Sequence, residues 1–115
     1  MDIDDYQQRA LRTINPALND SDRLLDAGIG LAEEAAELLG LIRKRVFQGR
    51  DVDPARLSEE LGDVLWCLAI SADTLGIRLS QVAEANDAKL RRRHPDGFKS
   101  PASRGPENWS RSLKE

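Results

Sequence analysis

The stretches Glu59-Glu60-Leu61-Gly62-Asp63-Val64-Leu65-Trp66 and Glu33-Glu34-Ala35-Ala36-Glu37 are two acidic motifs in largely apolar surroundings. Each motif places two carboxylates three residues apart, Glu34 with Glu37 and Glu60 with Asp63. Side chains at positions i and i+3 lie on the same face of an α-helix. Because apolar residues recur at helical spacing around both motifs, we expect two neighbouring helices that offer four oxygen ligands to one region.

The apolar stripes of these two helices predict how the helices face each other. At about 100° per residue, one stripe forms on each helix: Leu31, Ala35, Leu38, Ile42 and Val46 on the first, and Leu57, Leu61, Val64, Leu68, Ala72 and Leu75 on the second. Measured from these stripes, Glu34 and Glu60 have about the same angular offset, and Glu37 and Asp63 lie roughly 60° further round. In an antiparallel pair with facing stripes, equal offsets fall on one side, so all four carboxylates are predicted to converge.

Glutamate pairs also occur on solvated helix faces, where they favour the helix and bind nothing. The matched offsets favour a metal site over that interpretation. Glu34 and Glu60 also border the apolar stripes, near Leu41 and Cys67, where an unpaired carboxylate is partly desolvated and therefore unfavourable. A bound cation removes this penalty. Oxygen ligands without His or Cys suit Mg²⁺, and Mn²⁺ as a substitute.

Length, composition and charge narrow the classes of protein. A chain of 115 residues forms one domain, and 32% charged with 4% aromatic residues favours an all-α fold over a β-sandwich. The net charge of -3 gives no global basis for binding nucleic acid or an anionic membrane, so any phosphate-binding surface must be local. Cys67 is the single cysteine, and the acidic N-terminus has no apolar signal core. We therefore expect a cytoplasmic protein.

Periodicity and turn residues predict four helices. The first spans about residues 3–14, and the second runs from N-cap candidates in residues 19–22 to about Phe47. The third opens at Asp53-Pro54 and ends at Leu75-Gly76, and the fourth runs from an N-cap at Ser80 to His94. A domain over residues 1–98 is followed by residues 99–115, an extended or flexible tail in which Trp109 is a weak candidate for docking on a surface.

Trp66 and Ile70 lie opposite the main apolar stripe of the third helix, which makes this helix apolar nearly all round. It therefore needs neighbours on two sides, supplied by a four-helix monomer or by a second copy of the chain. For Trp66, packing in a core or an interface is favoured over stacking on a bound base.

The fourth helix carries the complementary charge. Asn86, Lys89 and Arg93 follow Val82 at spacings that align them on one face. Lys89 and Arg93 are suited to binding phosphate oxygens, the lysine as a point charge and the arginine as a planar fork. The alternative is that these bases merely complement the negative end of the helix.

Taken together, the two acidic motifs and the segment Asn86-Asp-Ala-Lys89-Leu-Arg-Arg-Arg93-His-Pro-Asp-Gly-Phe98 resemble the MazG-like branch of the all-α nucleoside triphosphate pyrophosphohydrolases. The resemblance covers about residues 3–98. It implies a four-helix-bundle-like fold completed by a homodimer or homotetramer. It also implies Mg²⁺-dependent hydrolysis of canonical or damaged (deoxy)nucleoside triphosphates to monophosphate and pyrophosphate, as in nucleotide-pool cleaning. The implied metal ligands are Glu34, Glu37, Glu60 and Asp63, and the implied phosphate contacts are Asn86, Lys89 and Arg93.

Glu33 neighbours Glu34 and lies one turn before Glu37, so it is our candidate for orienting or deprotonating the attacking water. Its alternative is a solvated surface position. Two other functions fit helical acids: a di-iron oxidase, which needs Glu-x-x-His motifs that this chain lacks, and a non-catalytic helical dimerisation or adaptor module. Metal-dependent turnover separates the adaptor from the enzyme.

Overall fold

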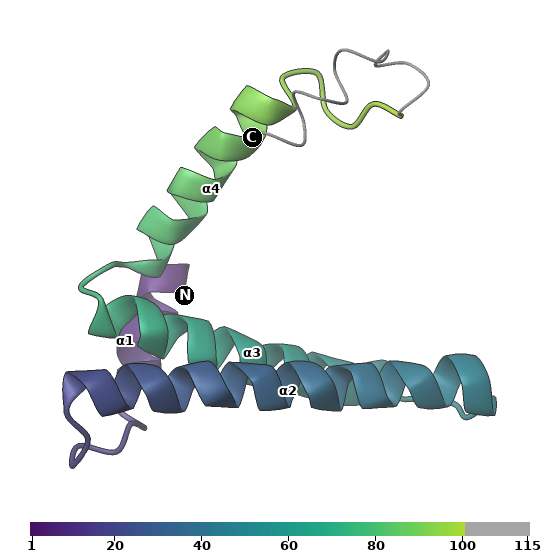
Figure 1. Ribbon diagram of the computed structural model, residues 1–115, viewed down its shortest axis with the longest axis horizontal. Coiled ribbons are helices and arrows are strands. Elements are labelled where there is room, and N and C mark those ends of the chain that lie inside the picture. Colours follow the sequence, from purple (N-terminus) through teal and green to yellow (C-terminus); the bar gives the residue numbers. More distant parts are fainter. Residues whose placement is uncertain (101–115) are drawn as a thin grey trace. The chain divides into compact units, whose positions relative to one another are not determined.

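The computed structural model describes residues 1–100 and contains four α-helices: α1 (Ile3–Leu11), α2 (Asp20–Gln48), α3 (Pro54–Thr74) and α4 (Leu79–Arg93) (Figure 1). No strand occurs among these residues, so the all-α prediction is confirmed. Met1–Ser80 form one compact unit, and the described residues from Gln81 to Ser100 belong to a second. Trp109 and most of the predicted tail lie outside the described residues.

α1 begins as the sequence predicts but ends earlier. Asp2 and Asp5 form a capping box, in which the Asp5 N–H donates to Asp2 Oδ1 at 2.8 Å and the Asp2 N–H donates to Asp5 Oδ2 at 3.4 Å. The helix was expected to reach residue 14 and stops at Leu11. The reason is local: the N–H of Thr13 turns back to the Ala10 carbonyl, to which the Thr13 hydroxyl also donates at 2.7 Å.

α2 and α3 begin at the predicted caps. Asn19 accepts from the Asp22 N–H at 2.8 Å, and Asp53 accepts from the Ala55 N–H at 3.0 Å ahead of Pro54 in the first turn. Gly49 ends α2 with φ of 61°, a left-handed conformation that favours glycine.

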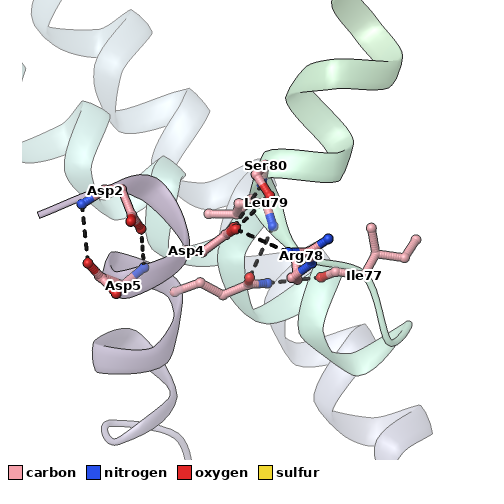
Figure 2. Close-up of polar contacts among 8 residues, drawn as sticks. Asp2, Asp4, Asp5, Ile77, Arg78, Leu79 and Ser80 are labelled. Carbon is pink, nitrogen blue, oxygen red and sulfur yellow. Dashed lines mark hydrogen bonds and ion pairs between the residues drawn. The ribbon is translucent and has the colours of Figure 1, made fainter.

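The prediction that Ser80 is the N-cap of α4 is wrong. The helix already begins at Leu79, and α1 satisfies its first N–H groups: the Leu79 N–H donates to Gln7 Oε1 at 3.0 Å, and the Ser80 N–H donates to Asp4 Oδ1 at 2.9 Å. Asp4 also accepts from the Ser80 hydroxyl and lies 3.9 Å from the Arg78 guanidinium (Figure 2). A tertiary contact therefore replaces the local cap.

α3 is the central helix of the first unit. It runs antiparallel to α2 along its length, and α1 packs on its C-terminal half (Figure 1). Trp66 packs against the core, and its indole N–H donates to Thr13 Oγ1 at 2.8 Å. The prediction that α3 needs neighbours on two sides is thus confirmed. The core consists mainly of small side chains: Ala10, Ala27, Ala69, Ile70, Ala72 and Leu79.

The prediction of which helix faces meet between α2 and α3 is wrong, because α3 is rotated about its axis relative to the expected orientation. On the expected contact stripe of α3, Leu61 is 55% exposed and Leu75 is 60% exposed. Cys67 is buried instead, and a Cβ added at Gly30 would lie 3.2 Å from its sulfur. The small residue at position 30 lets the two helices approach closely along a line that also contains the acidic residues.

Candidate metal centre

Three of the predicted metal ligands lie together between α2 and α3. Glu34, Glu37 and Glu60 each offer one carboxylate oxygen, and these three oxygens all lie within 4.8 Å of one another. The i, i+3 spacing places Glu34 and Glu37 on one face of α2, and the close approach of the helices brings Glu60 of α3 to the same point. The cluster contains no His or Cys.

Two carboxylate oxygens in this cluster are buried without a hydrogen-bond partner, Oε2 of Glu34 and Oε2 of Glu60. Glu60 is 3% exposed, and its other oxygen lies 3.4 Å from the Arg56 guanidinium. Buried carboxylate oxygens require a donor or a cation, since their desolvation is otherwise uncompensated. One arginine beside three acids leaves that requirement unmet, and a divalent cation fits the donor set.

The pKa values in the cluster reflect the same crowding. The pKa of Glu34 is raised from 4.5 to about 7, chiefly by its side-chain hydrogen bond with Glu60, then by burial and by the charges of Glu37, Asp63 and Glu60. The pKa of Glu37 is also raised, first by its hydrogen bond with Glu60. Without a cation the cluster therefore retains a proton near neutral pH, and a bound cation would displace it.

Asp63, the fourth predicted ligand, is not part of the three-carboxylate cluster. It lies close enough for its charge to raise the pKa of Glu34, and it lines a pocket together with Glu33 and Glu34. The structure therefore brings three of the four acids together and leaves Asp63 beside them.

The pocket next to the cluster has a volume of about 380 Å³. Residues of both acidic motifs line it, namely Glu33, Glu34, Asp63 and Trp66. The other lining residues were not assigned to a site by the sequence analysis: Asp26, Ile29, Gly30 and Cys67. Burial, followed by the nearby charges of Glu34, Asp63 and Asp26, raises the pKa of the Cys67 thiol, so this side chain stays neutral. Helical spacing offered one signal for the missed residues, because Ile29 and Gly30 lie three and four residues after Asp26, and Glu33 lies four and three residues after them.

Comparison with known proteins gives the family. The sequence model of the MazG nucleotide pyrophosphohydrolase domain matches residues 26–98. The chain belongs to the MazG family. It is also 34% identical over 108 residues to the Gene 37 protein of Mycobacterium phage L5. The matched region covers 84% of this chain and 92% of the phage protein. No solved structure matches it.

The MazG match contains the acidic cluster, the adjoining pocket and all of α4, and it leaves α1 outside. Asn86, Lys89 and Arg93 lie on α4 within the second unit of the chain, so their phosphate role stays a prediction. Within that helix Arg91 pairs with Asp87 at 3.0 Å. None of the helices described in this MazG chain has the length and apolar character needed to cross a bilayer.

Proposed function

We propose that this MazG domain hydrolyses (deoxy)nucleoside triphosphates to the monophosphate and pyrophosphate, with Mg²⁺ held by Glu34, Glu37, Glu60 and Asp63. The observation that carries the proposal is the set of three carboxylate oxygens within 4.8 Å of one another, two of whose side chains have a buried oxygen without a partner. A triphosphate needs positive charge around it, and a cluster in which three acids face one arginine is suited to bind it through a cation.

The ligand chemistry favours Mg²⁺, with Mn²⁺ as a substitute. Hard cations prefer carboxylate oxygens and water, whereas zinc sites are usually built with His or Cys, which are absent from this cluster. When bound, the cation neutralises phosphate charge and lowers the pKa of a coordinated water.

The chain's own side chains supply the remaining functions. Glu33 lines the pocket next to Glu34, and we assign it the orientation of the attacking water by hydrogen bonding. On α4, we assign Asn86, Lys89 and Arg93 to the phosphates, the last two through charge-assisted hydrogen bonds. Water adds to phosphorus, pyrophosphate leaves, and the products are one monophosphate and one pyrophosphate.

We also propose that the protein acts as a homodimer in the cytoplasm, with a homotetramer as the alternative assembly. Large apolar side chains are exposed on one long helix, including Leu25, Leu39, Val46 and Phe47 of α2. A shallow, mostly apolar pocket on the surface of α2 is lined by Leu24, Leu25, Gly28, Ile29 and Ala32. A second copy of the chain would cover such surfaces, which are too extensive for a monomer. The unpaired thiol of Cys67 fits a reducing compartment.

The test is a panel of ribo- and deoxyribonucleoside triphosphates with Mg²⁺ or Mn²⁺, scored for pyrophosphate against orthophosphate. We expect pyrophosphate release that stops with chelator and falls at least about a hundredfold in Glu37→Gln, since a lost ligand removes metal and substrate together. Asp63→Asn tests the fourth ligand in the same assay. Metal-independent turnover, or no turnover of any triphosphate, would contradict the proposal and favour the adaptor module.

A further inference from the structure

We propose that the pocket beside the acidic cluster holds the nucleobase, and that Asp26 selects bases bearing an exocyclic amino group at C4 of a pyrimidine or at C6 of a purine. Cytosine and adenine are such bases. This inference rests on the proposed function, because it names the substrate class of the same site. It deepens that function by identifying a residue outside the two acidic motifs as the determinant of base preference.

The first step is the position of the pocket. Glu34 belongs both to the carboxylate cluster and to the pocket lining, so the two sites are continuous. Asp26 lies eight residues before Glu34 on α2, which is about 12 Å along the helix at about 1.5 Å per residue. A nucleotide with its phosphates at the cluster therefore has room for its sugar before its base reaches Asp26.

The second step is the size and lining of the pocket. Its volume of about 380 Å³ lies in the range of about 300–1,000 Å³ that is typical of small-molecule sites. Ile29 and the Trp66 ring supply apolar and aromatic surface, and the hydrogen bond of 2.8 Å from Trp66 to Thr13 restrains that ring. Aromatic side chains next to apolar surface are the usual contacts of an unpaired base.

The third step is the chemistry of Asp26, the acidic group of the pocket furthest along α2 from the cluster. Its carboxylate makes no hydrogen bond or ion pair with the part of the chain that the structure describes. An ionised carboxylate accepts hydrogen bonds and donates none. The amino groups of cytosine and adenine are donors, whereas uracil, thymine and hypoxanthine present a carbonyl oxygen that a carboxylate repels. Asp26 is exposed, so water competes for its carboxylate, and the expected discrimination is smaller than at a buried polar group.

Matched substrates test this directly: dCTP against dUTP, and ATP against ITP. Each pair differs in the amino-to-carbonyl exchange. We expect kcat/KM to favour the amino member by at least about tenfold in the wild-type protein. Asp26→Asn should reduce that ratio by about tenfold or more, because the amide can turn to donate. Asp20→Asn, an exposed acid in the first turn of the same helix and outside the pocket lining, should leave the ratio unchanged.

A binding measurement separates this inference from the proposed function. In a Trp109→Phe background Trp66 is the remaining tryptophan, and without metal its fluorescence should be quenched by deoxycytidine at concentrations at least about tenfold lower than by deoxyuridine, since neither nucleoside carries a phosphate for the acidic cluster to repel. Pyrophosphate release with base ratios near one in both wild type and Asp26→Asn would overturn the base assignment and leave the hydrolase intact. Selective quenching without hydrolysis of any triphosphate would retain the base pocket and overturn the proposed function. Equal quenching by deoxycytidine and deoxyuridine would overturn the inference on its own.

Discussion

Replacing Gln7 by leucine should destabilise the protein by about 3 kcal/mol. Gln7 is 1% exposed, and its amide nitrogen donates to the carbonyls of Ala69 and Ile77 at 3.1 Å each, while its oxygen accepts from the Leu79 N–H at 3.0 Å. Leucine fits a helix as well as glutamine does, so helix propensity does not enter.

The magnitude follows from the hydrogen bonds that are lost. The Leu79 N–H is buried and costs about 1–3 kcal/mol without its partner, whereas the Ala69 carbonyl lies inside α3, keeps its helical N–H and loses a second hydrogen bond worth about 0.5–1.5 kcal/mol. The Ile77 carbonyl is only partly buried and adds less, and the apolar leucine offsets part of the loss. A change of about 3 kcal/mol lowers the melting temperature by about 12–24 °C in a domain of this size.

Urea unfolding followed by circular dichroism measures the change. Gln8→Leu is the matched control, since Gln8 is the exposed neighbour on the same helix, and it should shift the free energy of unfolding by less than about 0.5 kcal/mol. A loss below about 1 kcal/mol in Gln7→Leu, or equal losses in the two variants, would refute the anchoring role of these three hydrogen bonds.

Three further predictions concern the acidic cluster and α4. Glu60→Gln should raise the melting temperature of the metal-free protein by reducing repulsion, and should reduce the further rise on adding Mn²⁺; both are read by thermal scans. The raised pKa of Glu34 means that the folded state holds this proton more tightly than the unfolded state. The resulting contribution to the free energy of unfolding is fully present below about pH 4.5 and is lost as the pH rises through about 7. In chelator, the melting temperature of wild type should fall over that range relative to Glu34→Gln, and parallel curves would contradict the shift. Lys89→Ala and Arg93→Ala should each weaken binding of a slowly hydrolysed triphosphate by about 1.5–3 kcal/mol and leave Mn²⁺ affinity alone, whereas unchanged nucleotide affinity would remove α4 from the site.

The sequence predicted the elements because their signals are local. Asn19 and Asp53 cap the helices they precede, and Pro54 begins α3 where proline is tolerated. The i, i+3 spacing of Glu34 and Glu37 likewise needs nothing beyond one helix, so their common face was predictable. Their meeting with Glu60 was also predicted, although from a different helix rotation than the structure shows.

The orientation of α3 about its own axis, and so the face that it turns toward α2, could not be derived from periodicity, since α3 carries apolar residues on more than one face. The contact of Gly30 with Cys67 selects the face, and it depends on the shapes of both helices. The start of α4 was missed for a related reason: Asp4 and Gln7 satisfy its first N–H groups from more than 70 residues away in the sequence.

Direct titration with Mn²⁺, followed by the loss of its free-ion electron paramagnetic resonance signal, tests the metal centre without a nucleotide. Glu37→Gln removes one of the three clustered oxygens, and Glu59→Gln removes an exposed acid on α3 that pairs with Arg56 at 3.6 Å outside the cluster. We predict that wild type and Glu59→Gln bind Mn²⁺ with equal affinity and that Glu37→Gln binds it at least about tenfold more weakly. Equal affinity in all three proteins, or no binding by wild type at millimolar Mn²⁺, would contradict the assignment of this cluster as the metal centre.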